Sequence, residues 1–193
     1  MTITVDANQA QSATNWQPGV HWDYARALQT ARELEALAVV WLEEPLPQYA
    51  FEDIARLNDA VSIPTAGGEN NVGLHEFTRK VRENVYDVLQ PESMVNAGIT
   101  TLRKIGTLAQ AFWKKCVPQQ GGGDIGGGAH LHLVASWSNA PFMELLHDPP
   151  IGDYRHKFSI FANPPEVSEG MMSVLTGPGL GVEINPDLIE SDS

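Results

Sequence analysis

The chain has 193 residues, 42% of them hydrophobic, and a net charge of −12. Its length allows one large domain with a sizeable core, and its acidic balance argues against a nucleic-acid or anionic-membrane surface, since both need an excess of Lys and Arg. A single cysteine, Cys116, excludes an internal disulfide. No leader pattern and no apolar run near ~18 residues is visible, so we expect a cytoplasmic protein with no membrane association.

Apolar, β-branched segments alternate with amphipathic segments along the first 145 residues. The predicted strands are 2–6, 38–42, 62–66, 86–89, 115–117 and 142–145. The predicted helices are 22–37, 51–57, 73–82, 99–112 and 129–136. This alternation favours βαβ units and a parallel sheet, and polar residues at most strand ends favour a barrel over an open sheet.

Two other segments differ from this alternation. Residues 121–128 are rich in glycine without a following Lys-Ser/Thr, so they are not a Walker phosphate loop; we expect a flexible loop over the substrate. The tail is rich in Pro and Gly. The predicted organisation is therefore a barrel portion at 1–150 and a C-terminal tail at 151–193, which packs on the barrel or on another domain.

Acidic residues follow three successive predicted strands. Asp6 ends the first strand, Glu43 and Glu44 follow the second, and Glu69 follows the third. Because side chains alternate along a strand, Glu43 and Glu44 point to opposite faces, and at most one of them enters a shared site. Three oxygen donors suit a hard cation such as Mg²⁺, while solvated charges or helix caps remain the alternative.

Several motifs together resemble the enolase superfamily, within its mandelate racemase/muconate lactonizing enzyme group. They are Val5-Asp6-Ala7-Asn8-Gln9, Trp41-Leu42-Glu43-Glu44-Pro45, Gly67-Gly68-Glu69-Asn70, Asp87–Glu92, Asn96–Thr100 and Pro178–Val182. The resemblance covers nearly the whole chain. It implies an α/β fold, namely a partial (β/α) TIM-type barrel that contains strands three to eight. The N-terminal capping domain and the first two barrel strands would be lacking.

The resemblance also implies an activity. Members of the group use Mg²⁺ to abstract the proton α to a carboxylate through an enediolate, as sugar-acid dehydratases or 2-hydroxy-acid racemases do. The implied metal ligands are Asp6, Glu43 and Glu69, and Asn8 matches a position that contacts substrate. The expected partner is therefore a small-molecule hydroxy acid or sugar acid.

The acid–base residues depart from the pattern of the group. Glu92 falls where the group has an Asp that orients a catalytic His, and Gln119 falls where it has the His. An amide cannot transfer a proton near neutral pH, so the usual His base is absent. Glu144 matches an acid that hydrogen-bonds the enediolate, with a structural salt bridge as its alternative. His130 and His132 fall on the next helix, where we expect packing or capping.

The Lys bases of the second barrel strand have no counterpart in this sequence. The alternative function is therefore a non-catalytic remnant, or a split-barrel subunit that binds metal and needs a partner chain. A barrel left open would expose a strand edge and apolar helix faces, so we expect a homo-oligomer or a complementing chain.

Overall fold

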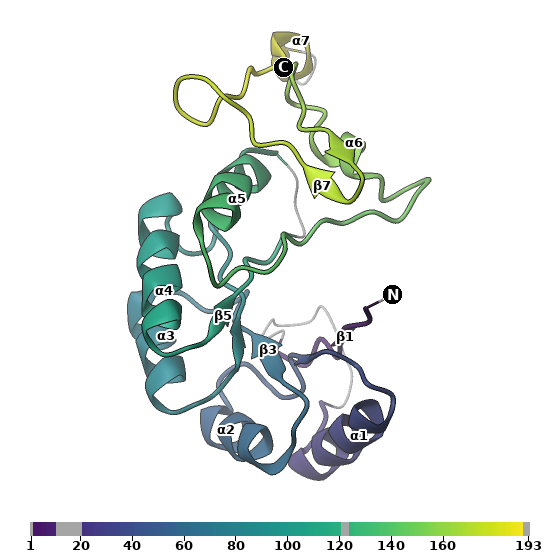
Figure 1. The fold of residues 1–193 in the computed structure, drawn as a ribbon, viewed down its shortest axis with the longest axis vertical. Helices are drawn as coiled ribbons and strands as arrows, with labels where there is room; N and C mark the ends of the chain where they lie inside the picture. The colour runs from purple at the N-terminus through teal and green to yellow at the C-terminus, as the bar shows by residue number, and fades with distance from the viewer. Residues whose placement is uncertain (1, 11–20, 121–123, 191–193) are drawn as a thin grey trace.

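A computed structural model describes residues 2–10, 21–120 and 124–190 of the chain. Its main feature is a sheet of five parallel strands, which neighbour one another in chain order (Figure 1). The strands are β1 (Val5–Asp6), β2 (Leu42–Glu43), β3 (Thr65–Gly67), β4 (Val88–Leu89) and β5 (Lys115–Cys116). The fold class is thus α/β with a parallel sheet, as predicted.

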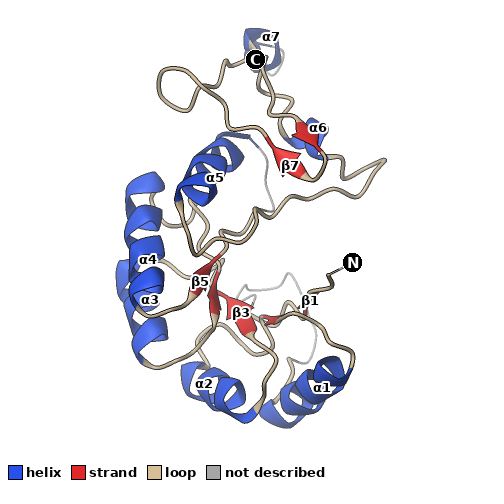
Figure 2. Cartoon of the chain, viewed as in Figure 1, coloured by secondary structure: helices blue, strands red, loops and turns tan. Residues whose placement is uncertain are grey.

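A helix follows each strand. The helices are α1 (Tyr24–Ala36), α2 (Phe51–Ala60), α3 (Gly73–Arg82), α4 (Ile99–Ala111) and α5 (Asp124–Ser136). The first four connect successive strands and lie along the outer side of the curved sheet, with the strands on the inner side (Figure 2). Parallel strands require such crossovers, and here the helices cover one face of the sheet only.

The register of the sheet aligns the carboxyl ends of its strands. Asp6 lies opposite Glu43 across the β1–β2 pair, and Glu43 lies opposite Ala66 of β3. Backbone bonds continue past the short strands: Ala7 N–H donates to Glu43 O at 3.0 Å, and Glu44 N–H donates to Ala66 O at 3.0 Å. The polar residues that follow the strands are therefore brought to one edge.

Both faces of the sheet bury apolar side chains. The larger core lies between sheet and helices and includes Leu42, Ile54, Leu57, Phe77, Leu89 and Ile105, all fully buried. A smaller cluster on the inner face consists of Trp41, Ala66, Val88 and Val117. Alternation along β2 explains this division, because Leu42 points outward while Trp41 and Glu43 point inward.

Helix α5 begins five residues earlier than predicted, at Asp124 rather than Ala129. Its glycines allow close packing, since a Cβ at Gly127 would lie 2.7 Å from the Phe158 ring. Phe158 belongs to the tail, as do Phe161 and Val182 beside Gly128, so the two glycines form a surface on which the tail packs. The prediction of a flexible loop over the substrate is therefore wrong for 124–128, and residues 121–123 lie outside the described chain.

The predicted strand at 142–145 is absent. The structure has no strand between Val117 and Glu166 in its described residues. The β5 residue Cys116 instead donates its N–H to Asn139 O at 3.0 Å, upstream of the predicted strand. The residue pattern suited a strand, but a strand also needs a neighbouring ladder, and the sequence alone did not reveal whether one exists.

The tail forms a small unit of its own beyond α5 (Figure 1). It contains α6 (Tyr154–Lys157), an antiparallel hairpin of β6 (Val167–Ser168) and β7 (Met171–Met172), and α7 (Pro186–Glu190). Its core is the cluster of Tyr154, Phe158 and Phe161. Among the described residues, no helix is both long and apolar enough to cross a membrane.

Candidate metal and substrate site

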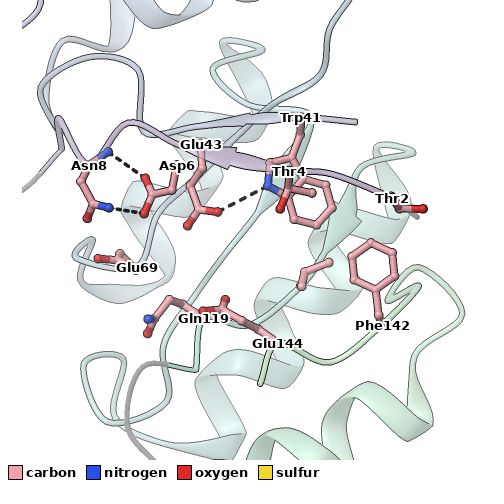
Figure 3. A pocket seen from close by; sticks show the side chains of 11 residues that line it. Thr2, Thr4, Asp6, Asn8, Trp41, Glu43, Glu69, Gln119, Phe142 and Glu144 are labelled. Carbon is pink, nitrogen blue, oxygen red and sulfur yellow. Dashed lines mark hydrogen bonds between the residues drawn. The ribbon is translucent and has the colours of Figure 1, made fainter. Parts of the chain in front are cut away.

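A cavity of about 630 Å³ lies at the carboxyl edge of the sheet (Figure 3). Its lining residues come from β1 and β2 with their flanking residues, and from the segments after β3, β5 and α5. They are Thr2, Thr4, Asp6, Asn8, Trp41, Glu43, Glu69, Val117, Gln119, Phe142 and Glu144. All the predicted site residues except Glu92 thus line one cavity. None of the lining residues is Lys, Arg or His.

Asp6 is oriented by Asn8, two residues further along the chain. The backbone N–H of Asn8 donates to Asp6 Oδ1 at 2.8 Å, and the Asn8 side-chain amide donates to Oδ2. Asn8 has a positive φ of 50°, which bends the chain back toward Asp6. Burial in the cavity raises the pKa of Asp6, although its surface is partly open to solvent, and the two Asn8 bonds oppose this rise.

Glu43 is held by two donors, one just before it in the same segment and one just after β4. Trp41 Nε1 donates to Glu43 Oε2 at 3.4 Å, and the Gln90 side chain donates to the same carboxylate. Burial raises the pKa of Glu43 to about 8; the Gln90 bond opposes the rise, and the nearby carboxylates of Asp6, Glu144 and Glu69 add to it. The arrangement gathers carboxyl groups at this point of the cavity, and burial with their mutual repulsion favours the protonated form of Glu43.

Glu69 and Glu144 reach the cavity from loops. The Asn70 amide donates to Glu69 Oε1 at 3.1 Å, while burial, followed by repulsion from Asp6, raises the pKa of Glu69. Burial raises the pKa of Glu144 to about 7, against a backbone N–H bond from Gln120. No Lys, Arg or His of the described chain forms an ion pair with Glu144, so the salt-bridge alternative is wrong for this part of the molecule.

Glu44 lies on the opposite side of β2 from Glu43, as strand alternation predicts. It has a positive φ of 42° and is only 1% exposed. Both Glu44 oxygens and Lys80 Nζ are buried without a hydrogen-bond partner in the described chain. Burial raises the pKa of Glu44 to about 9 and lowers that of Lys80 to about 7. Glu44 therefore belongs to the core between sheet and helices and not to the cavity.

Glu92 does not enter the cavity. Its Oε2 accepts from Val95 N–H at 2.8 Å, and its Oε1 lies 3.6 Å from His130 Nε2. His130 is fully buried on α5, where its Nε2 accepts from Ser93 N–H at 3.1 Å; burial lowers its pKa to about 4, so the ring is neutral at pH 7. A turn and His130 thus hold Glu92 outside the lining of the cavity, and its role in the catalytic site stays a prediction. The packing or capping role expected for His130 is confirmed.

Two aromatic residues of the cavity were missed by sequence reasoning. The rings of Trp41 and Phe142 stack with centroids 5.4 Å apart and an interplanar angle of 27°. The sequence marked both only as apolar positions of strands. A signal was available for Trp41, since a residue two positions before Glu43 in a strand must share its face.

The lining residues fit Mg²⁺ in kind. Mg²⁺ prefers oxygen ligands and usually keeps several waters, and four carboxylates whose charges oppose one another face this cavity. As the side chains stand, no three Asp, Glu, His or Cys residues of the described chain are grouped closely enough to hold one ion. Binding would therefore require rotation of at least one half-buried glutamate toward Asp6.

Comparison with known proteins identifies the family of this chain. Residues 1–188 match the enolase C-terminal domain-like family. The chain belongs to this family. The expected membership of the enolase superfamily, in the mandelate racemase/muconate lactonizing enzyme group, is thereby confirmed.

Two curated relatives illustrate the match. The arabinonate dehydratase of Saccharolobus solfataricus is 30% identical over 188 residues, which are 97% of this chain and 46% of the relative. The D-galactarolactone cycloisomerase of Agrobacterium fabrum is 26% identical over 193 residues, 98% of this chain and 48% of the relative. The enolase-family chain thus spans about half the length of the relatives it matches.

Solved structures give the same picture. The 3,6-anhydro-D-galactonate cycloisomerase of Zobellia galactanivorans has a TM-score of 0.83 and 28% identity, covering 99% of this chain and 50% of that one. The L-talarate/galactarate dehydratase of Salmonella typhimurium LT2, liganded with Mg and L-lyxarohydroxamate, has a TM-score of 0.79 and 28% identity. The match covers 98% of this chain and 42% of that one.

Proposed function

We propose that this chain carries the metal-binding half of a Mg²⁺-dependent enzyme that abstracts the proton α to the carboxylate of a sugar acid or 2-hydroxy acid. The observation that supports this most strongly is the cavity itself, where four carboxylates gather at the carboxyl edge of a parallel sheet. Dehydration or cycloisomerisation of sugar acids is the activity for which the curated relatives are named. In this proposal the sheet is part of a (β/α) barrel.

Asp6, Glu43 and Glu69 are the proposed metal ligands. When bound, Mg²⁺ would supply positive charge beside the substrate carboxylate and the enediolate that forms from it. Asn8 holds the Asp6 carboxylate and the donors Trp41 and Gln90 hold that of Glu43, so the chain fixes two ligands before any ion arrives. Asn8 also lines the cavity and is a proposed contact for substrate.

Glu144 is the proposed acid. Its pKa of about 7 leaves a large share of the side chain protonated near neutral pH, in the form that donates a hydrogen bond to the enediolate. Gln119 lines the cavity beside it and has an amide that donates a hydrogen bond but transfers no proton. Both groups are half-buried in the cavity, which reduces their contact with water.

A second function remains in competition: a non-catalytic or split-barrel subunit that needs a partner chain. The observation that favours it is the absence of Lys, Arg and His from the lining residues that the structure describes. Every titratable group of the lining is then a carboxylate, and three of these are assigned to metal. A partner, or a further segment, that brings a basic residue to the open side of the cavity would complete the site.

Exchange of the α-proton tests the proposal. The chain is incubated in D₂O with Mg²⁺ and a panel of sugar acids and 2-hydroxy acids, and deuterium incorporation is followed by NMR. Incorporation by the chain alone, lost in Glu69→Gln, supports a competent enzyme. Incorporation only after addition of the amino-terminal half of a relative supports the split barrel. No incorporation in either case, together with no Mg²⁺ binding, contradicts both functions.

A further inference from the structure

The segment that carries Glu144 reaches the cavity without strand pairing. Residues 140–147 form neither helix nor strand. Upstream, Cys116 N–H to Asn139 O is the backbone bond that joins this part of the chain to β5, and downstream Leu145 packs against the tail cluster. Between these two anchors the Gln120 backbone N–H bonds the Glu144 carboxylate, which ties Glu144 to the segment after β5 but not to Glu43 on β2. A further contact is needed to fix the distance between Glu144 and Glu43.

The contact that spans this gap is the stack of Trp41 and Phe142 (Figure 3). Trp41 is 5% exposed and immediately precedes β2, which is paired on both sides, and its carbonyl accepts from Val5 N–H at 3.1 Å, so its ring is a fixed surface. Phe142 is 44% exposed and comes from the unpaired segment. The indole N–H of Trp41 also donates to Glu43, so one side chain contacts both Glu43 and the segment that carries Glu144.

We propose that the stacked rings of Trp41 and Phe142, here called the aromatic clasp, position Glu144 opposite Glu43 in place of a strand ladder. Both are positioning residues. The catalytic relevance of holding Glu144 at this place rests on the proposed function, in which Glu144 is the acid. The stacking contact itself does not depend on catalysis.

Phe142 has a second consequence for the site. It lines the acidic cavity and also a neighbouring apolar groove of about 390 Å³ between α5 and the β6–β7 hairpin. The Phe142 ring therefore separates a polar space from an apolar one. Opening of the clasp joins the two spaces and moves Glu144 away from the proposed ligands.

Cleavage after Glu144 by a glutamate-specific endoprotease measures this opening. The scissile bond must leave its packed position to enter the protease, so under conditions of fast reclosing the rate follows the population of the open segment. The proteins compared are the unaltered chain, Phe142→Leu, Phe142→Tyr and Phe112→Leu. Phe112 is also about half exposed, at 47%, but lies after α4 and away from the cavity, so it is the matched control.

The expected result follows from the strength of an aromatic stack, which changes an equilibrium by about 2- to 10-fold. Phe142→Leu should be cleaved after Glu144 faster by about that factor, while Phe142→Tyr, which keeps the stack, and Phe112→Leu should match the unaltered chain. Cleavage after Glu76, which lies within α3 and needs that helix to unfold, is the internal reference for global unfolding. The proposed clasp is overturned if Phe142→Leu is cleaved after Glu144 no faster than the unaltered chain. It is also overturned if Phe142→Tyr is cleaved there as fast as Phe142→Leu.

A companion variant separates the two contacts of Trp41. Trp41→Phe keeps an aromatic ring for the stack but removes the N–H donor to Glu43. Cleavage after Glu144 should stay near that of the unaltered chain, while Mg²⁺ affinity measured by calorimetry should fall several-fold. Accelerated cleavage in Trp41→Phe contradicts the assignment of the clasp to ring stacking. Failure of the unaltered chain to bind Mg²⁺ contradicts the proposed function and leaves the cleavage result to decide the clasp.

Discussion

The acidic cavity has two walls that are held in different ways. The ladder wall consists of Asp6 on β1 and Glu43 on β2, which lie opposite each other in the sheet register. The loop wall consists of Gln119, Phe142 and Glu144, which follow β5 in segments without strand pairing. A ladder fixes backbone position through many bonds that do not depend on side-chain identity, whereas the loop wall depends on a few specific contacts.

This difference indicates where substitutions should act globally and where locally. Substitutions in the core that supports the ladder wall should lower the stability of the whole sheet, because β2 is paired with both of its neighbours. Substitutions in the loop wall or the tail should leave the sheet intact and change only the position of a few side chains. Three predictions test this contrast, from the largest expected effect to the smallest.

Leu42→Ala should have the largest effect. Leu42 is fully buried on β2 in the core between sheet and helices. Loss of its side chain leaves a cavity, and we expect the free energy of unfolding to fall by about 2–5 kcal/mol in urea titrations. Leu146→Ala, at a 42% exposed position beside the loop wall, is the control and should stay within about 0.5 kcal/mol. A loss at Leu42 no larger than the control would contradict the contrast.

Gly127→Ala and Gly128→Ala form a matched pair on α5. A Cβ at Gly127 would lie 2.7 Å from Phe158, whereas at Gly128 the nearest atom, on Val182, is an ordinary 3.6 Å away. Both variants gain the same helix propensity, so this gain cancels in the comparison. We expect Gly127→Ala to be less stable than Gly128→Ala by about 1–3 kcal/mol, measured by thermal or urea unfolding. Equal stability would show that α5 and the tail do not pack closely.

The pH dependence of stability should reveal the charge on the ladder wall. Burial raises the pKa of Glu43 from 4.5 to about 8, so folding favours its protonated form. Below about pH 4.5 Glu43 is protonated in both the folded and the unfolded chain, and the folded state has its full stability. As the pH rises toward 8, the unfolded chain loses this proton more readily than the folded chain, and the free energy of unfolding falls. The melting temperature of Glu43→Gln, relative to the unaltered chain in metal-free buffer, should therefore rise across this window. Glu166→Gln, at an exposed position, should show no such trend.

The sequence predicted the ladder wall better than the loop wall for a physical reason. Helix spacing gave α3 at 73–82 as observed, and acidic residues after successive strands identified Asp6, Glu43 and Glu69 as neighbours. Parallel strands with crossover helices must place their carboxyl ends together, so spacing along the chain becomes proximity in space.

The loop wall obeys no such rule. The segment 142–145 has the composition of a strand, yet its position is set by a stack with Trp41 that no periodicity reveals. Glu92 follows a strand as Glu69 does, but it bonds the backbone of the following turn, lies beside His130 and is not among the residues that line the cavity. Glu144 lines the cavity although no strand carries it, and its role as the acid stays a proposal.

The central claim is that the carboxylates of the cavity bind Mg²⁺, and calorimetric titration of the metal-free chain tests it most directly. Glu43 and the exposed Glu166 are each replaced by Gln, which conserves shape and removes one charge. The account predicts saturable binding of one Mg²⁺ in the unaltered chain and in Glu166→Gln, and binding at least about 100-fold weaker in Glu43→Gln. Unchanged affinity in Glu43→Gln, or no binding in the unaltered chain, would contradict it.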